Sequence, residues 1–295
     1  MELRHLRYFL AVAEESNVTR AAEKLGIGQP PLSQQIKQLE QEMQVELFRR
    51  TAHGVVLTAA GEAFRVEATR VVDQARVAVR AAQRAARGDT GQLRLGFTGS
   101  AAFNPIVPNL IRAFRERYTS VELSLEEANT TQLIDGIERR RLDAAFIRPF
   151  DNLPDSLRVD RVTDEAMKVA VASRHRLAHS RRISMADLAH EPFVIVPRAS
   201  GSTLYDDVHD ACRRAGFEPI VGQFAPQMSS MVNLVAAEFG IAIVPASITQ
   251  LKVHGVRYLD ISGDAPRARL GLATRRDETS VVVENLLSLL ESSAA

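Results

Sequence analysis

Residues 18–43, VTRAAEKLGIGQPPLSQQIKQLEQEM, decide the fold of the first part of this chain. Ala21, Ala22 and Leu25 have the spacing of one apolar face and predict a short helix, which the following Gly26 would end. The prolines in QPPL predict the first turn of a second helix, where their missing N–H groups are tolerated. The stretch therefore predicts two helices joined by a tight turn.

The second of these helices has two unlike faces. Its buried stripe is predicted to consist of Leu32, Ile36 and Leu39. The opposite face carries the polar residues Ser33, Gln34, Lys37 and Gln38. Such side chains can bond base edges or phosphates from a helix in the major groove, so the pattern is typical of a recognition helix.

The flanking segments complete a small module. Residues 3–13 form an amphipathic pattern that predicts an opening helix ending near Ser16. In residues 45–61, VELFRRTAHGVVLTAAG, two short apolar stretches flank a His53-Gly54 turn and predict a wing. Arg49, Arg50 and His53 would then lie near the phosphate backbone, where positive charge adds salt-sensitive affinity.

Residues 1–61 resemble the winged helix-turn-helix of LysR-type transcriptional regulators, through LRHLRYFLAVAEESNVTRAAEKLGIGQPPLSQQIKQLEQEMQVELFRR and LTAAG. The resemblance implies contacts to double-stranded promoter or operator DNA. Expected base contacts come from Gln29, Pro30, Pro31, Ser33 and Gln34, and expected backbone contacts from Lys37, Arg50 and His53. Many relatives carry arginine at the position of Gln34, so the sequence preference stays open.

A long helix is predicted after Thr58, which can cap it. Its apolar residues advance by steps of four and three, as in a heptad seam: Phe64, Ala68, Val71, Ala75, Ala78, Ala82 and Ala85. Because no second helix is expected nearby, this seam favours pairing between two chains over folding back on the same chain. The family resemblance implies a dimer of dimers. The chain is therefore expected to assemble with further copies of itself, as a homodimer or homotetramer.

From Gly91 onward, predicted strands and helices alternate and indicate a parallel sheet flanked by helices. Two crossovers near residues 159–163 and 266–270 predict two α/β lobes. This arrangement resembles the family's periplasmic-binding-protein-like effector domain. The expected fold class is α/β. The expected domains are residues 1–58 (winged helix-turn-helix), 59–88 (linker and dimerisation helix) and 89–295 (effector domain). Within the effector domain, lobe I is expected at about 89–161 and 268–295, and lobe II at about 162–267.

Open α/β sheets bind ligands beyond the carboxyl ends of their strands, and three strand-to-helix junctions offer hydroxyls, amides and helix N-terminal N–H groups. The expected effector-binding residues are Thr98, Gly99, Ser100, Asn129, Thr130, Arg148, Arg198, Ser202, Thr203 and Met228. Apolar walls are expected from Phe97, Phe103, Phe146, Phe150 and Met228. Helix capping by Ser and Thr and surface ion pairs of the arginines are the plainer alternatives. The donors predict a small anionic effector, an organic acid.

Enzymatic and metal-dependent functions have little support. No G-x-S-x-G, Walker or GxGxxG motif occurs, so no catalytic residue, cofactor or metal is expected. His175 and His179 have i, i+4 spacing but are interpreted as surface residues, and the single cysteine, Cys212, as a structural thiol.

The net charge of +1 is uninformative, since residues 1–90 carry 13 Lys and Arg against 11 Asp and Glu. The N-terminus lacks the apolar core of an export signal, and no apolar run suits a bilayer, so a cytoplasmic location without membrane contact is expected. RNA polymerase is a further expected partner. Two alternatives remain at this point: a solute-binding protein or enzyme on the same two-lobed scaffold, and an architectural DNA-binding protein without a ligand.

Overall fold

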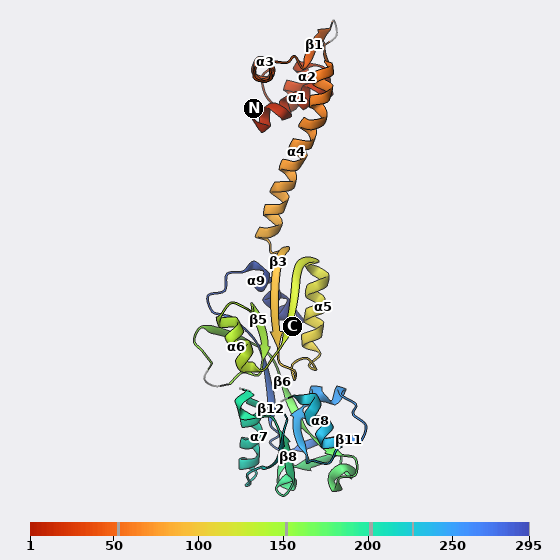
Figure 1. Cartoon of the computed structure of the whole chain (residues 1–295), viewed down its shortest axis with the longest axis vertical. Helices are drawn as coiled ribbons and strands as arrows, with labels where there is room; N and C mark the ends of the chain where they lie inside the picture. The colour runs from red at the N-terminus through yellow and green to blue at the C-terminus, as the bar shows by residue number, and fades with distance from the viewer. Residues whose placement is uncertain (52–53, 151–152, 201–202, 226, 295) are drawn as a thin grey trace. The chain divides into compact units, whose positions relative to one another are not determined.

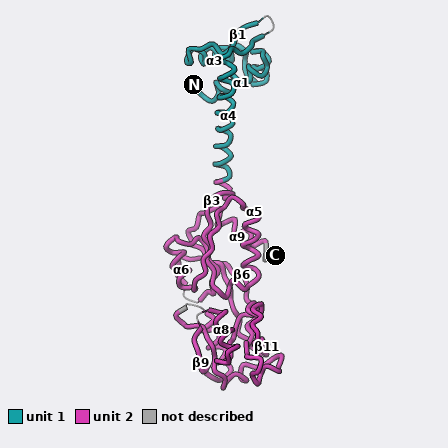
Figure 2. Tube along the Cα trace, turned by 45° about the vertical axis from the view of Figure 1, so that its right-hand side comes forward, with its two compact units in different colours: residues 1–84 teal, residues 85–295 magenta. Residues whose placement is uncertain are grey.

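The computed structural model describes residues 1–51, 54–150, 153–200, 203–225 and 227–294. The chain divides into two compact units, Met1–Arg84 and Ala85–Ala295, which are coloured separately in Figure 2. Each unit has its own apolar core, and each is described by itself. None of the described helices combines the length and the hydropathy that a bilayer span requires.

Unit 1 contains a helix-turn-helix followed by a hairpin and a long helix (Figure 1). The elements are α1 (Leu3–Glu15), α2 (Val18–Leu25), α3 (Gln29–Met43), β1 (Phe48–Thr51), β2 (Gly54–Leu57) and α4 (Ala59–Ala86). The predicted helix pair, the predicted wing and the predicted long helix are thus all present. The tip of the wing, with His53, lies outside the described residues.

Helix termini in unit 1 form where the sequence places capping residues. The Asn17 side chain accepts hydrogen bonds from the amides of Thr19 and Arg20, at 2.9 and 3.1 Å, and so caps α2. Gly26 ends α2 with a φ of 68°, a left-handed conformation that favours glycine. Thr58 caps α4 by accepting from the Gly61 amide at 2.9 Å.

The core of unit 1 is built around Phe9 of α1. Its ring centroid lies 5.1 Å from that of Phe48 on the wing and 4.8 Å from that of Phe64 on α4. The recognition-helix stripe of Leu32, Ile36 and Leu39 is buried in the same core, as predicted. One core therefore fixes α3, the wing and the start of α4 together.

The predicted seam of α4 needs a correction in its first half. Phe64 and Ala68 pack into the core of their own unit, and the next buried position is Val72 rather than Val71, which is 47% exposed. The expectation that no second helix lies nearby is wrong here, because Leu10 of α1 borders the same groove as Val72. The later alanines of the predicted seam, Ala78, Ala82 and Ala85, are exposed.

Unit 2 contains two lobes joined by two strands. Lobe I consists of β3 (Thr90–Phe97), α5 (Ile106–Arg117), β4 (Ser120–Glu127), α6 (Thr130–Glu138), β5 (Ala144–Ile147) and α9 (Val281–Ala294). Lobe II consists of β7 (Arg182–Ser184), β8 (Pro192–Ile195), α7 (Thr203–Arg214), β9 (Ile220–Phe224), α8 (Met228–Ala236), β10 (Ala242–Pro245) and β11 (Val256–Ser262). Short 3₁₀ helices follow several of these strands, at Arg176–His179, Met185–Leu188, Arg198–Ser200 and Ala246–Gln250. Figure 1 shows α5 and α6 on opposite sides of β3.

The joining strands are β6 (Leu157–Ala172) and β12 (Arg267–Arg275); all of β12 pairs antiparallel with residues 157–166 of β6. The strand order is β4-β3-β5-β12-β6-β11-β7, with β10 also paired to β6. The sheet is therefore mixed: β3 pairs parallel with β4 and β5, but β12 pairs antiparallel with β5. The expectation of a parallel sheet is thus correct for β3, β4 and β5 of lobe I. It is wrong for the joining strands, because β6 and β12 run between the lobes in opposite directions and hydrogen-bond to each other. The strands β7 and β11 were not predicted.

Candidate DNA-binding face and effector cleft

The face of α3 opposite its buried stripe is solvent-exposed and polar. Pro30, Pro31, Gln34 and Lys37 are exposed, and Ser33 is half-buried. The Gln29 amide donates to the Ser33 hydroxyl at 2.8 Å, which holds both side chains at the start of the helix. The structure thus places all the α3 residues of the predicted recognition set on one helix, while His53 of the predicted set lies outside the described residues.

Gln35 has a structural environment that the sequence did not reveal. His5 of α1 is 2% exposed, and its Nε2 lies 2.9 Å from the Gln35 Oε1. This buried contact ties α3 to α1, and the neighbouring Gln34 remains exposed. The two adjacent glutamines therefore have different environments, although they are chemically identical.

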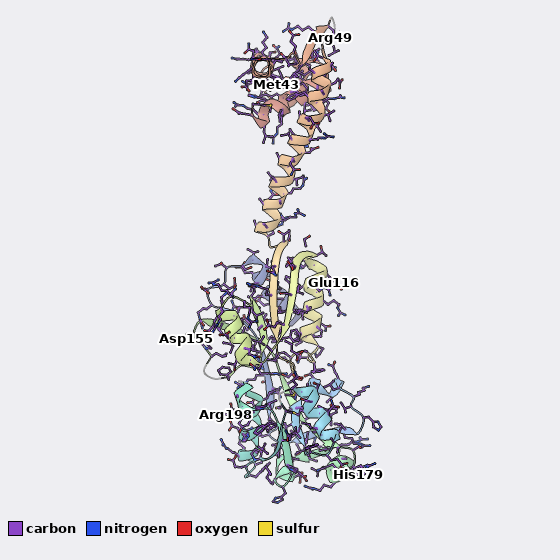
Figure 3. The ribbon with its side chains drawn as sticks, in the orientation of Figure 1. Met43, Arg49, Glu116, Asp155, His179 and Arg198 are labelled. Atoms are coloured by element: carbon purple, nitrogen blue, oxygen red, sulfur yellow. The ribbon has the colours of Figure 1, made fainter. Side chains whose placement is uncertain are left out.

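The wing is held to α3 by a carboxylate. Glu40 Oε1 accepts hydrogen bonds from the amides of Leu47 and Phe48, at 2.8 and 3.1 Å. This fixes the start of β1, whose Arg49 and Arg50 are exposed; Arg49 is labelled in Figure 3. The two arginines face opposite sides of the hairpin, because successive side chains of a strand alternate.

We expect Lys37→Ala and Arg50→Ala each to weaken DNA binding in a salt-dependent manner. The slope of log K against log salt concentration is negative. If each side chain contacts one phosphate, the magnitude of this slope decreases by about 1 in each variant, with little change in sequence preference. Fluorescence anisotropy with a labelled DNA duplex over a range of salt concentrations measures this slope. Arg174→Ala, which removes an exposed charge from unit 2, is the control; an unchanged slope for both unit 1 variants contradicts the expected contacts.

Unit 2 contains a cleft of about 710 Å³ bordered by residues of both lobes. Its volume suits a small molecule. Its lining comprises Thr98, Gly99, Ser100, Ala102, Phe103, Glu127, Ala128, Asn129, Thr130, Gln132, Arg148, Val196, Leu204, Gln227, Met228 and Ser229.

Most of the predicted effector-binding residues line this cleft. These are Thr98, Gly99, Ser100, Asn129, Thr130, Arg148 and Met228. Arg198 and Thr203 are absent from the lining, and Ser202 lies outside the described residues. Of the expected apolar walls, Phe103 and Met228 line the cleft, whereas Phe97, Phe146 and Phe150 do not. The sequence analysis did not predict Glu127, Gln132 or Gln227 as cleft residues. For Glu127, the sequence did contain a signal, because this residue comes two positions before the predicted strand-to-helix junction at Asn129.

Arg148 is the main buried cation at the cleft. Its side chain is 1% exposed, and its guanidinium donates to the Ser100 hydroxyl at 3.1 Å, to the Glu165 carboxylate at 3.2 Å and to the carbonyls of Ala268 and Arg269 at 3.2 Å. Burial lowers the pKa of Arg148 from its ordinary value, and Glu165 opposes that shift. The alternative of a surface ion pair is wrong for this residue.

Glu165 carries these contacts into lobe II. It lies on the joining strand β6 and accepts from the Ser247 amide at 2.8 Å and the Ser247 hydroxyl at 3.1 Å. Asn104, in lobe I, donates to the same carboxylate at 3.3 Å. A chain of buried polar contacts thus runs from Ser100, at the cleft, through Arg148 and Glu165 to Ser247.

The two helices that begin at the cleft differ in their caps. Asn129 and Gln132 form a reciprocal capping box at α6, so that N-terminus is satisfied within the chain. The N-cap residue of α8, Gln227, makes no side-chain cap hydrogen bond. Thr130 is 1% exposed and its hydroxyl has no hydrogen-bond partner among the described residues. The cleft therefore offers polar groups whose hydrogen bonds a ligand can complete.

Arg198 lies beside α7 (Figure 3) and is not among the residues that line the cleft. Its Nε is 3.6 Å from an oxygen of Asp206, and its guanidinium lies 6.0 Å from the centroid of the Tyr205 ring. Arg198 therefore forms a surface ion pair, which was the alternative to effector binding for this residue.

The histidine pair is only partly as predicted. His179 is exposed, but His175 is half-buried, with its Nε2 3.0 Å from Glu191. The interpretation of both as surface residues is wrong for His175, because a carboxylate distant in sequence packs against it. Among the described residues, no group of three or more His, Cys, Asp or Glu side chains could hold a metal ion.

Cys212 is fully buried on α7, and burial raises the pKa of its thiol to about 12. At pH 8 the reactive thiolate fraction is then roughly 10⁻⁴. We expect iodoacetamide to leave the native protein unlabelled at pH 8 over an hour, and to label it fully in urea, as measured by mass spectrometry. Rapid labelling without urea contradicts the structural interpretation of this thiol.

Two family models match almost the entire chain. Residues 3–62 match the bacterial regulatory helix-turn-helix protein of the lysR family, and residues 86–295 match the LysR substrate binding domain. The chain is 38% identical to the HTH-type transcriptional regulator BudR of Raoultella terrigena over 98% of this chain and 100% of BudR. It is 34% identical to the HTH-type transcriptional regulator AlsR of Bacillus subtilis over 98% of this chain and 95% of AlsR. Both relatives are named as regulators, not as enzymes.

Solved structures give the same result. The crystal structure of full-length CbnR complexed with its target DNA matches 100% of both chains, with 26% identity and a TM-score of 0.83. Together, the helix-turn-helix with its wing, the two-lobed unit with its cleft and these matches show that the chain belongs to the LysR family of DNA-binding transcriptional regulators.

Proposed function

We propose that this regulator binds paired operator half-sites as a homodimer or homotetramer and that a small organic acid in the cleft of unit 2 controls its activity. The observation that carries the effector half of the proposal is the buried chain of contacts from Ser100 through Arg148 and Glu165 to Ser247. It connects the cleft lining in lobe I to lobe II. The proposed domains are residues 1–58, 59–88 and 89–295.

For DNA, we propose that the start of α3 enters the major groove. Gln29, Ser33 and Gln34 would contact bases, beside Pro30 and Pro31, while Lys37, Arg50 and His53 contact the phosphate backbone. The exposure of Gln34 and Lys37 and the exposed wing arginines support this assignment. Because DNA is the target, the proposed site of action is the cytoplasm of a bacterial cell, and RNA polymerase is a proposed further partner.

For assembly, we propose that the second half of α4 pairs with another copy. This part of the helix exposes Val77 and Val79 as well as the alanines Ala78, Ala82 and Ala85. Small residues allow close helix packing, and exposed valines favour burial in an interface. Two paired recognition helices would then read two half-sites, which supplies the specificity that one short helix lacks.

For the effector, the uncapped N-terminus of α8 and the Ser100 hydroxyl support a carboxylate ligand. A ligand that contacts Ser100 in lobe I and Gln227 in lobe II favours the lobe arrangement in which both contacts form. This differential binding would change the DNA complex and transcription.

DNase footprinting on the DNA immediately upstream of the regulator's own gene tests the proposal. The expected result is protection of two or more spaced half-sites that survives competitor DNA and changes when small carboxylic acids are added. Protection that is independent of sequence and disappears with moderate salt favours an architectural DNA-binding protein instead. Unchanged footprints and transcription across a broad panel of acids contradict the effector half of the proposal.

A further inference from the structure

Among the described residues, the charged side chains of the cleft lining are Arg148 and Glu127, and of these two Arg148 alone has a described partner of opposite charge. Arg148 is paired with Glu165 and uses its remaining donors on Ser100 and on backbone carbonyls. Glu127 is exposed, and its carboxylate makes no hydrogen bond or ion pair with the described residues. The uncompensated charge of the cleft lining is therefore negative.

The Glu127 carboxylate lies against the loop that also supplies Ser100. Glu127 is the last residue of β4 and pairs with Phe97 of β3, so it reaches the point where β3 ends. A Cβ atom added to Gly99 would lie 2.7 Å from Glu127 Oε1. The absence of a side chain at Gly99 thus leaves room for the carboxylate in the cleft lining.

The same cleft contains groups that suit an anion. The α8 N-terminus has no side-chain cap, and Gln227, Met228 and Ser229 of its first turn line the cleft. The buried Thr130 hydroxyl, at the first residue of α6, also lines the cleft, has no partner among the described residues and can donate to or accept from a ligand. The α6 N-terminus, in contrast, is closed by its own capping box and has Glu127 close by in sequence. The cleft therefore has separate positions for an anionic and a cationic group.

We infer that the effector is a zwitterion, a carboxylic acid that also carries an ammonium group, and that Glu127 determines this specificity by binding the ammonium. This inference rests on the proposed control by an organic acid. A simple carboxylate would bring a second negative charge beside the unpaired Glu127, whereas an ammonium group compensates that charge and satisfies its oxygens. Amino acids are the simplest members of the class.

The test uses the full-length chain and two matched sets of probes at pH 7. One set is the α-amino acids, and the other is the carboxylic acids that have the same side chains but lack the amino group. Thermal shift selects binders, and isothermal titration calorimetry measures their affinities. We expect at least one amino acid to bind tenfold or more tightly than its matched acid.

The variant Glu127→Gln keeps the size of the side chain and removes its charge. It is expected to weaken binding of the amino acid at least tenfold and to change binding of the matched acid less than threefold. Glu122→Gln, an exposed change of the same kind on the same strand but outside the cleft lining, is expected to leave both affinities unchanged. Because Glu127 is exposed, its replacement leaves the folded core intact.

Two results separate the possible failures. If matched acids bind as tightly as amino acids, or Glu127→Gln leaves the preference unchanged, the zwitterion inference is overturned while control by an organic acid stands. If no probe of either set binds the wild-type protein, both the inference and the proposed acid effector are overturned.

Discussion

Replacing Arg148 with alanine is expected to lower the free energy of unfolding of unit 2 by about 3–5 kcal/mol, because it leaves the Glu165 carboxylate without its cation. Glu165 would keep Ser247 and Asn104 as donors, but these are neutral groups. Removing one member of a buried ion pair costs far more than the pair itself contributes, since the remaining charge stays desolvated. Urea unfolding followed by circular dichroism measures the change.

Arg139→Ala is the matched control for this prediction. Arg139, the C-cap residue of α6, has a side chain that is 77% exposed and forms an ion pair with Asp135 of that helix, so its loss is expected to cost less than about 0.5 kcal/mol. Arg148→Lys keeps the charge but loses the forked donor geometry, so an intermediate effect is expected. Equal stability of the Arg148→Ala and Arg139→Ala variants would show that the Arg148–Glu165 contact is not important for the fold.

Replacing Gly61 with alanine is expected to destabilise unit 1 by about 3 kcal/mol and to abolish specific DNA binding at 37 °C. A Cβ atom at this position would lie 2.1 Å from the carbonyl oxygen of Leu47 and 2.9 Å from the Leu57 side chain. The first contact is with the backbone, so a rotamer change cannot relieve it. Either α4 or the wing must move, and both are anchored in the core that positions α3.

Gly26→Ala provides the comparison. Gly26 has a φ of 68°, but an added Cβ would meet no atom within 4 Å. Its replacement therefore costs only the left-handed backbone conformation, about 1–2 kcal/mol. Thermal unfolding of the full chain, together with DNA binding below the midpoint temperature, distinguishes the two variants. A smaller loss of stability for Gly61→Ala than for Gly26→Ala would contradict the steric explanation.

Much of unit 1 followed from local sequence. The capping Thr58, the left-handed Gly26 and the prolines at the start of α3 act on their nearest neighbours in the chain, so their effects are visible without a fold. The same holds for the buried stripe of α3, which repeats with the helical period. In unit 2, the alternation of apolar strands and amphipathic helices likewise predicted most elements and the two crossovers.

The ligand cleft was predictable only in outline. Strand ends and helix starts indicated Ser100, Asn129 and Thr130, because ligands bind where strands run into helices. Arg198 satisfied the same local rule but lies outside the cleft lining. Which junctions share a cleft depends on how the two lobes pack, and strand order is not encoded in any short window of sequence.

The sequence by itself determined the family, the helix-turn-helix with its wing and the two-lobed architecture, because capping residues and apolar periods act locally. Tertiary structure alone decided the electrostatics of the cleft and the register of α4. Arg148 is neutralised by Glu165 from a joining strand, the Glu127 carboxylate has no partner among the described residues, and Val72 rather than Val71 is buried in the core of unit 1. The physical reason is that burial and charge pairing depend on residues far apart in the chain, which only the folded core brings together.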